Sequence, residues 1–163
     1  MKTTQPRTRQ HGFTLVELMV TISVLVILLA VAVPSLHRFT VRNQLAVARD
    51  DLAAALGLAR MEAVRQGAST LLLATSGSLA NGWQVCADNG SSACVAGPVV
   101  RLYAAPPADV QLSGPAALAI NALGVPAAGA STYTVCPAGG GSGYVVQLNA
   151  SGTVDVDTHA SCP

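Results

Sequence analysis

The sequence predicts an α+β protein in which a long amino-terminal helix packs on an antiparallel β-sheet. Three patterns support this prediction. An apolar run covers residues 13–33, a helical repeat of apolar residues extends to residue 63, and short alternating runs bounded by Gly, Pro, Ser and Asn fill the chain from residue 70 onward. Because helix and strand patterns are segregated along the chain, the helix should cover one face of the sheet.

The apolar run from Phe13 to Val33 is long enough to cross a membrane. Its 21 residues would span about 31 Å at about 1.5 Å per residue, close to the roughly 30 Å of a bilayer core. Pro34 closes the run and predicts a helix break or kink. Lys2, Arg7 and Arg9 precede the run without any acid, so the amino terminus should stay cytoplasmic and the remaining chain should lie beyond the membrane.

Glu17 is the one ionisable residue in this run. A carboxylate among lipid tails is costly and usually has a functional partner. Cleavage after Gly12 would create a free α-amine on Phe13, and a second copy of the helix could offer that amine to Glu17. Such pairing would neutralise both charges and fix the axial register of neighbouring helices. The alternatives are a Glu17 wetted at the interface, or a secretory signal cleaved near residues 30–35.

The residues Gly12-Phe13-Thr14-Leu15-Val16-Glu17, with Pro34 closing the run, resemble the class III signal of type IV pilins and pseudopilins. The resemblance implies that prepilin peptidase removes the leader, residues 1–12, methylates Phe13, and leaves Glu17 to guide assembly with other pilins. It also implies a pilin-like fold in the bacterial inner membrane, and later in a pilus or pseudopilus. Its parts would be a transmembrane and assembly helix at 13–34, an amphipathic continuation at 35–67, and a periplasmic β-rich head at 68–163.

The continuation helix has one apolar face that ends near Gly67. Its members recur at spacings of three and four: Leu45, Ala48, Leu52, Leu56, Ala59 and Ala63. Arginines occupy other positions on the helix: Arg38, Arg42, Arg49, Arg60 and Arg65. We favour a solvated face with local ion pairs for these arginines; a contact surface for DNA or another partner is the alternative.

A second resemblance covers Arg60, Glu62 and Ala63, together with Trp83 in Gly82-Trp83-Gln84-Val85. This pattern is similar to the FimT/GspH group of minor pilins and pseudopilins. Members prime or tip type IV pili, serve in type II secretion, or bind DNA during natural transformation. DNA binding is associated with a Gly-Arg-x-Arg motif, but the corresponding stretch here, residues 152–157, carries acids or neutral residues. The resemblance therefore implies a minor pilin, with a pseudopilin as the alternative and a DNA receptor as the third reading.

The remaining chain predicts eight strands. They are Thr70–Thr75, Trp83–Ala87, Val99–Tyr103, Val110–Leu112, Leu118–Asn121, Tyr133–Cys136, Tyr144–Asn149 and Thr153–Asp157. We expect Trp83 to pack in the core. Asp155 and Asp157 alternate along one strand, so they should share a face and protect an exposed strand edge by charge.

The four cysteines, Cys86, Cys94, Cys136 and Cys162, all follow the apolar run and form an even set. Beyond the inner membrane they should form two disulfides. Three pairings are open, and spacing favours Cys86 with Cys94 and Cys136 with Cys162. A zinc site is the weaker idea because no CxxC pair occurs.

Charge and composition exclude several functions. From Gln66 onward only Arg101 opposes four acids, so this part of the chain has no footprint for a polyanion. Nucleophilic catalysis needs a base near a Ser or Cys, yet beyond the apolar run the histidines are His37 and His159. The sequence therefore predicts a protein that is not an enzyme and that needs neither cofactor nor metal.

Overall fold

The computed structural model describes residues 14–88, 90, 94 and 99–162, without the side chains of residues 159 and 160. The chain divides into two compact units, Met1–Phe39 and Thr40–Pro163, which are described separately below. The predicted cleavage site, Gly12 and Phe13, lies outside the described residues.

Helix α1 (Leu15–Gln66) contains Pro34 within its length. Proline lacks the N–H that would bond one turn back, but the flanking residues keep helical geometry and the helix does not end there. A kink at Pro34 stays a prediction. The helix begins after Thr14, whose hydroxyl oxygen accepts a hydrogen bond of 3.2 Å from the backbone N–H of Glu17.

In the second unit, the predicted apolar face of α1 is buried. Leu52, Leu56 and Ala59 are fully covered, and the other predicted members are at most 4% exposed. The helix ends because Gly67 adopts a left-handed conformation, with φ of 62°. The N–H of Ala68 then bonds back to the carbonyl of Ala63 at 3.2 Å, as is usual at a helix end closed by glycine.

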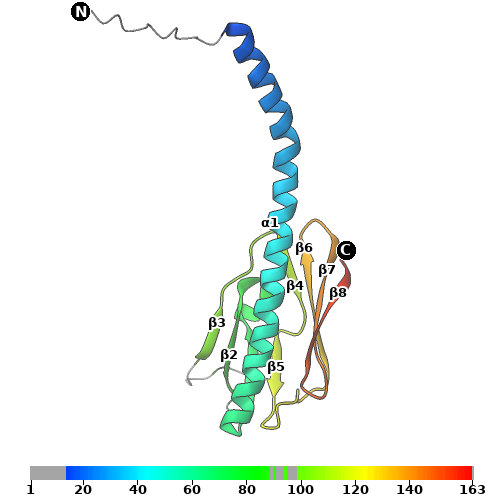
Figure 1. Ribbon diagram of the computed structural model, residues 1–163. Helices are drawn as coiled ribbons and strands as arrows, with labels where there is room; N and C mark the ends of the chain where they lie inside the picture. The colour runs from blue at the N-terminus through cyan, green and yellow to red at the C-terminus, as the bar shows by residue number, and fades with distance from the viewer. Residues whose placement is uncertain (1–13, 89, 91–93, 95–98, 163) are drawn as a thin grey trace, which may run out of the picture. The chain divides into compact units, whose positions relative to one another are not determined.

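Two four-stranded antiparallel sheets follow the helix (Figure 1). Sheet A has the order β3-β2-β1-β5 and sheet B the order β4-β6-β7-β8. The strands of sheet A are β1 (Thr70–Ala74), β2 (Trp83–Ala87), β3 (Val99–Tyr103) and β5 (Ala117–Ile120). Those of sheet B are β4 (Val110–Ser113), β6 (Ser131–Pro137), β7 (Gly141–Leu148) and β8 (Val154–Cys162).

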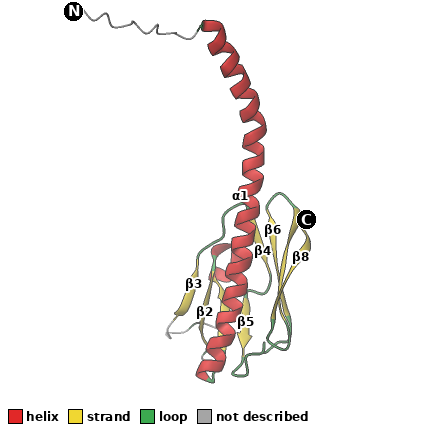
Figure 2. Ribbon diagram, in the orientation of Figure 1, coloured by secondary structure: helices red, strands yellow, loops and turns green. Residues whose placement is uncertain are grey.

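All eight predicted strands are present, but they form two sheets and not one. Two short 3₁₀ helices, η1 (Thr75–Gly77) and η2 (Leu79–Asn81), separate β1 from β2. Strands β7 and β8 are longer than predicted, because Gly141, Ser142 and Gly143 pair with the end of β8. The glycine-rich residues ahead of the predicted strand Tyr144–Asn149 are therefore partly a strand. Figure 2 shows the long helix and the strands as separate parts of the chain.

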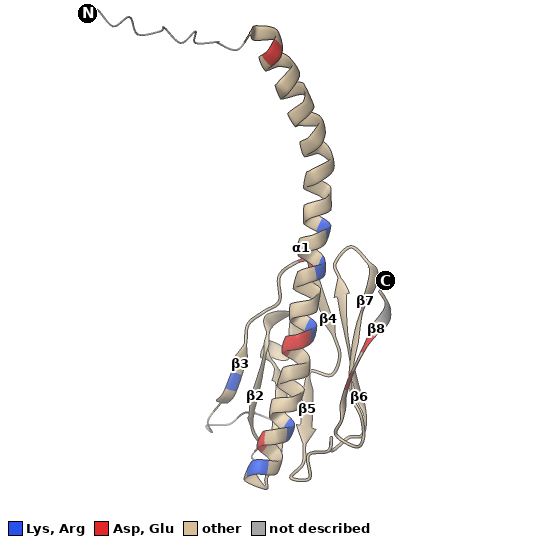
Figure 3. Cartoon of the chain, viewed as in Figure 1, with Lys and Arg blue, Asp and Glu red and all other residues tan. Residues whose placement is uncertain are grey.

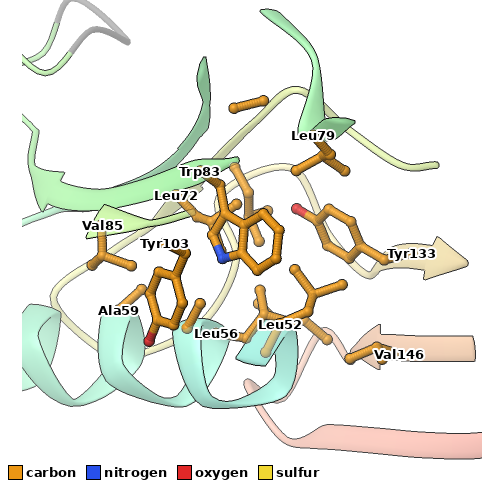
Figure 4. Packing of buried hydrophobic residues seen from close by; sticks show 14 of the residues in the cluster. Leu52, Leu56, Ala59, Leu72, Leu79, Trp83, Val85, Tyr103, Tyr133 and Val146 are labelled. Carbon is orange, nitrogen blue, oxygen red and sulfur yellow. The ribbon is translucent and has the colours of Figure 1, made fainter. Parts of the chain in front are cut away.

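The second half of α1 and both sheets share one core. Trp83 of β2 is 1% exposed and stacks on Tyr103 of β3, with ring centroids 5.5 Å apart. Figure 4 shows Trp83 with Tyr133 of β6 beside it, above Leu52 and Leu56 of α1. The core place predicted for Trp83 is confirmed. The chain has few aromatic residues, but these buried rings contribute large apolar surfaces to the core.

Candidate functional site

The first unit presents an exposed apolar helix with one carboxylate. Within the described residues, α1 is long and apolar enough to cross a membrane, by length and composition. Every large apolar side chain among residues 15–29 of this helix is at least 50% exposed. Glu17 is the acidic residue in the first turn of this helix, and Figure 3 shows acidic residues of the chain in red. A surface of this kind is stable only in lipid or against other helices.

The hydroxyl side chains that follow Glu17 form hydrogen bonds with the backbone of their own helix. The Thr21 hydroxyl donates to the Leu18 carbonyl at 2.8 Å, and the Ser23 hydroxyl donates to the Met19 carbonyl at 2.7 Å. Hydroxyls bonded to their own backbone are tolerated in an apolar environment. Among the described residues, the Glu17 carboxylate has no ion-pair partner, and it therefore retains the capacity to bind a cation from another chain.

Thr14 and Glu17 also form part of a helix cap. Thr14 precedes the first helical residue and Glu17 lies three positions later, which is the spacing of a capping box. The carboxylate additionally lies at the positive end of the helix dipole. Glu17 therefore has a local structural role that is separate from any role in assembly.

Two of the candidate DNA-contact arginines are engaged in local pairs. Arg49 bonds to Asp50 at 2.7 Å, and its guanidinium carbon lies 4.7 Å from the centre of the Tyr144 ring on β7. Arg65 bonds to Glu62, which also accepts from Gln66. These two bonds lower the pKa of Glu62 to about 2, and the hydrogen bond to Glu62 raises the pKa of Arg65. The favoured interpretation, local ion pairs along the helix, is confirmed for these two arginines.

Arg60 packs under two glycine turns. A Cβ built on Gly124 or Gly152 would lie 3.2 or 3.1 Å from its Nε atom. The same Cβ on Gly152 would lie 2.1 Å from the carbonyl oxygen of Gly124, so the two turns are in close contact. Arg60 is consequently half-buried. Arg42 is exposed in the second unit and Arg38 in the first.

An open depression lies along α1 in the second unit, with a volume of about 880 Å³. The residues that line it come from α1, from β3, from the β7–β8 turn and from the start of β8: Ala54, Gly57, Leu58, Arg60, Met61, Val64, Arg65, Arg101, Tyr103, Gly152 and Val154. Its lining is mainly apolar and includes Arg60, Arg65 and Arg101. This surface was not predicted, although the spacing of its apolar residues is visible in the sequence.

The cysteines form two disulfides, Cys86 with Cys94 and Cys136 with Cys162. This is the pairing that the sequence spacing favours. The first bond closes the segment after β2, and the second ties the end of β6 to the end of β8. Among the described residues, no group of three or more His, Cys, Asp or Glu side chains is arranged to hold a metal ion.

Asp155 and Asp157 are exposed on β8, whose described pairing is with β7 alone. Asn149 donates a hydrogen bond of 2.6 Å to Asp155. This matches the expectation of charged residues on an edge strand. The side chain of His159, considered above as a catalytic base, lies outside the described residues.

Two family models match this chain. The model described as "Type II transport protein GspH" matches residues 48–152, and the model described as "Prokaryotic N-terminal methylation motif" matches residues 7–33. The first covers the second half of α1 and most of both sheets. The second covers Gly12, Phe13 and the apolar run.

Two solved structures have a similar fold, and both are crystal forms of the type IV minor pilin FimU of Pseudomonas aeruginosa. The P21 form has a TM-score of 0.64 at 22% identity, covering 77% of this chain and 96% of that chain. The P65 form has a TM-score of 0.58 at 19% identity, covering 72% and 96%. No curated protein matches the chain. With its methylation motif, its pilin-like fold and a GspH model across most of its head, the chain belongs to the GspH family of pilin-like proteins, which are structural subunits of type IV pili or type II secretion systems and not enzymes.

Proposed function

We propose that this protein is a minor type IV pilin that primes or tips a pilus. The observation that carries the proposal is the residue order at the start of α1. Gly12 and Phe13 directly precede an exposed apolar helix, and Glu17 stands as its one carboxylate within the first turn. The methylation-motif model extends over the same residues.

In this proposal the precursor is stored in the bacterial inner membrane with its head in the periplasm. Prepilin peptidase cleaves between Gly12 and Phe13, and Phe13 becomes the methylated amino terminus. The new amine remains cationic after methylation and can pair with Glu17 of a neighbouring subunit. Neutralising both charges would favour one axial register among helices that otherwise slide freely against apolar neighbours.

The mature amino terminus tests the proposal directly. The precursor is expressed with and without prepilin peptidase, and its terminus is determined by intact mass and peptide sequencing. We expect a terminus at methylated Phe13 when the peptidase is present, and an uncleaved chain in its absence or in a Gly12→Val variant. An intact leader in the presence of active peptidase, or cleavage after residue 30, would overturn the proposal.

A pseudopilin of type II secretion is the second candidate, and the match to the GspH model favours it. Both functions use the same cleavage and assembly steps, so the amino terminus does not separate them. Deletion of the gene in its host separates the two functions. Loss of pili and of pilus-dependent movement, with secreted proteins unchanged in the medium, supports the pilin; the reverse pattern supports the pseudopilin.

A DNA receptor has less support, because Arg49 and Arg65 bond to acids of their own helix and Arg60 is half-buried beneath two turns. The arginines available for DNA binding are Arg38, Arg42, Arg49, Arg60 and Arg65. Arginines that bind phosphates displace counterions from the DNA, so the affinity for duplex DNA would fall steeply as salt is added. Binding of a labelled duplex to the full-length protein at two salt concentrations measures this.

A further inference from the structure

The two sheets of the head have four edge strands. Sheet A ends at β3 and β5, and sheet B ends at β4 and β8. The outer N–H and C=O groups of an edge strand have no partner in their own sheet, so another chain can pair with them unless the edge is covered or charged. Figure 1 shows β3 at the left margin of the head, beside β2. The four edges differ in how far they are protected.

Strands β5 and β4 are in contact with parts of the chain outside their own sheets. After β5 the chain turns back, so that Pro126 forms a bridge with Ile120 and the N–H of Ala127 donates to the carbonyl oxygen of Ala119 at 2.9 Å. These contacts occupy the side of β5 that faces away from β1. The short helix η2 lies against β4. Strand β5 is therefore covered along its edge, and β4 is flanked by a helix.

Strands β8 and β3 differ in charge. Strand β8 exposes Asp155 and Asp157, and carboxylates on an edge oppose the addition of another strand. Strand β3 contains no acid, and within the described residues it pairs with β2 alone. It exposes apolar side chains instead, since Val99 is 49% and Leu102 is 67% exposed. Among the four edges, β3 is thus the one best suited to receive a strand from another chain.

The last three residues of β3 form a regular strand with two distinct faces. Val100 has no partner in the register with β2 and is the extra residue of a bulge, whereas each later residue has one partner. Tyr103 is 6% exposed, and the guanidinium carbon of Arg101 lies 5.0 Å from the centre of its ring. Both residues line the depression along α1, so they face the helix. Leu102, between them, faces the other side of the sheet.

A strand added to β3 would place alternate side chains on these two faces. On one face they would lie beside Val99 and Leu102, where apolar side chains pack well. On the α1 face they would lie beside Arg101, next to a lining that is mainly apolar and includes no acid. Arg65 is already bonded to Glu62, but Arg101 has no ion-pair partner among the described residues. An acidic side chain on the α1 face of the added strand would supply that partner.

We propose that β3 takes a fifth strand of sheet A from a different protein: an extended segment that turns an acid towards α1 and apolar side chains to the other face. Backbone hydrogen bonds to β3 hold the segment, and the pair between its acid and Arg101 sets its register. The choice of a different protein rests on the proposed function, because a subunit that primes or tips a filament has other proteins as neighbours.

Photo-cross-linking in the host tests the site. Leu102 of the full-length protein is replaced by the photo-reactive amino acid benzoylphenylalanine. Leu123 is replaced in the same way as a control, since it is 80% exposed and lies outside the strands. Mass spectrometry identifies the segment joined to each position. We expect position 102 to join one acidic segment of a different protein, at a yield at least tenfold above that of position 123. No product, equal yields, or a product with a second copy of this chain would overturn the proposal.

Arg101 supplies a matched pair of variants. Arg101→Glu reverses the charge and Arg101→Lys keeps it, and the position is exposed, so neither should disturb the fold. We expect the glutamate variant to lower the cross-link at least tenfold and the lysine variant to keep at least half of it. Replacing the acid of the joined segment by arginine should restore the cross-link to Arg101→Glu. Equal cross-linking by the two variants, or no restoration, contradicts the pair between that acid and Arg101.

A synthetic peptide of the joined segment tests whether it binds as a strand. Its affinity for the full-length protein in detergent is compared with that of two peptides N-methylated at alternate residues, one set odd and the other even. Methylation removes backbone donors and keeps the side chains, and in a strand only one of the two sets points at β3. We expect one set to lower the affinity at least tenfold and the other to leave it unchanged. Equal effects of the two sets contradict strand addition.

Leader cleavage is scored in the same cells, so the two proposals fail separately. Normal cleavage at Phe13 without the cross-link from position 102 removes the strand site and leaves the pilin proposal intact. The cross-link without cleavage supports the strand site and removes the pilin proposal. Absence of both results removes both.

Discussion

The hydroxyl of Thr70 donates a hydrogen bond of 2.7 Å to the carbonyl oxygen of Ala59. Thr70 begins β1 and is fully buried, and Ala59 lies in the buried face of α1. This bond joins the helix to β1, an inner strand of sheet A, directly after the chain reverses at Gly67. Replacing Thr70 by valine should cost about 1–2 kcal/mol, because the shape is kept but the donor is lost.

Denaturant unfolding of the full-length protein in detergent measures this loss. Thr132→Val is the control, since Thr132 is exposed on β6, and it should change the free energy of unfolding by less than about 0.5 kcal/mol. Equal effects of the two substitutions would argue against a specific role for the Thr70 hydroxyl.

Gly152→Ala should be strongly destabilising. The new Cβ would lie 2.1 Å from the carbonyl oxygen of Gly124, and φ at this residue is +81°. Gly77→Ala is the matched control, because its φ of +76° carries a similar backbone cost while its Cβ meets nothing within 4 Å. We expect a loss of about 1 kcal/mol for Gly77→Ala and about 3 kcal/mol for Gly152→Ala, measured by thermal unfolding. Similar losses would show that the contact between the two turns relaxes freely.

Glu62 should make the last turns of α1 sensitive to acid. Its hydrogen bonds from Arg65 and Gln66 lower its pKa from 4.5 to about 2. A carboxylate with a lowered pKa adds stability above its unfolded pKa, and this stability is lost as the pH falls towards the folded value. The difference in unfolding midpoint between wild type and Glu62→Gln should be constant above about pH 5 and should shrink between pH 4.5 and 2. A difference that is unchanged at pH 2 would contradict this linkage.

Glu17→Ala should retain membrane insertion and leader cleavage but lower incorporation into filaments at least tenfold, because it removes the carboxylate that we propose to pair with the Phe13 amine of a neighbouring subunit. Quantitative immunoblotting of membrane and sheared filament fractions measures both. Thr14→Ala is the control for the helix cap, since it removes the hydroxyl acceptor and keeps the carboxylate. Incorporation of Glu17→Ala at the wild-type level would exclude the assembly role.

Much of the fold could be predicted because short sequence patterns indicate where the helix and the strands begin and end. The spacing of Leu45 to Ala63 identified the buried face of α1, and Gly67 marked its end. The strands could be located because Gly, Pro and Asn bound nearly every one of them. The GspH family was foreseen from Arg60, Glu62, Ala63 and Trp83 together with the leader motif.

The rest depended on contacts between distant segments. The division into two sheets follows from β1 pairing with β5 and β4 pairing with β6, which no local pattern encodes. The Gly141–Gly143 segment becomes a strand because it pairs with residues near Cys162, and glycine has no strand preference of its own. The placement of Arg60 beneath Gly124 and Gly152 likewise joins three distant parts of the chain.

The order of strands in the two sheets has a consequence for how the head is completed during synthesis. Every strand of sheet A lies at or before Ile120, and its first partner, the buried face of α1, precedes it in the chain. Sheet A can therefore close on the helix as soon as β5 is available. Sheet B must wait for β8, whose far end holds Cys162. Formation of the Cys136–Cys162 disulfide thus belongs to the final stage of folding, while Cys86 and Cys94 can pair earlier.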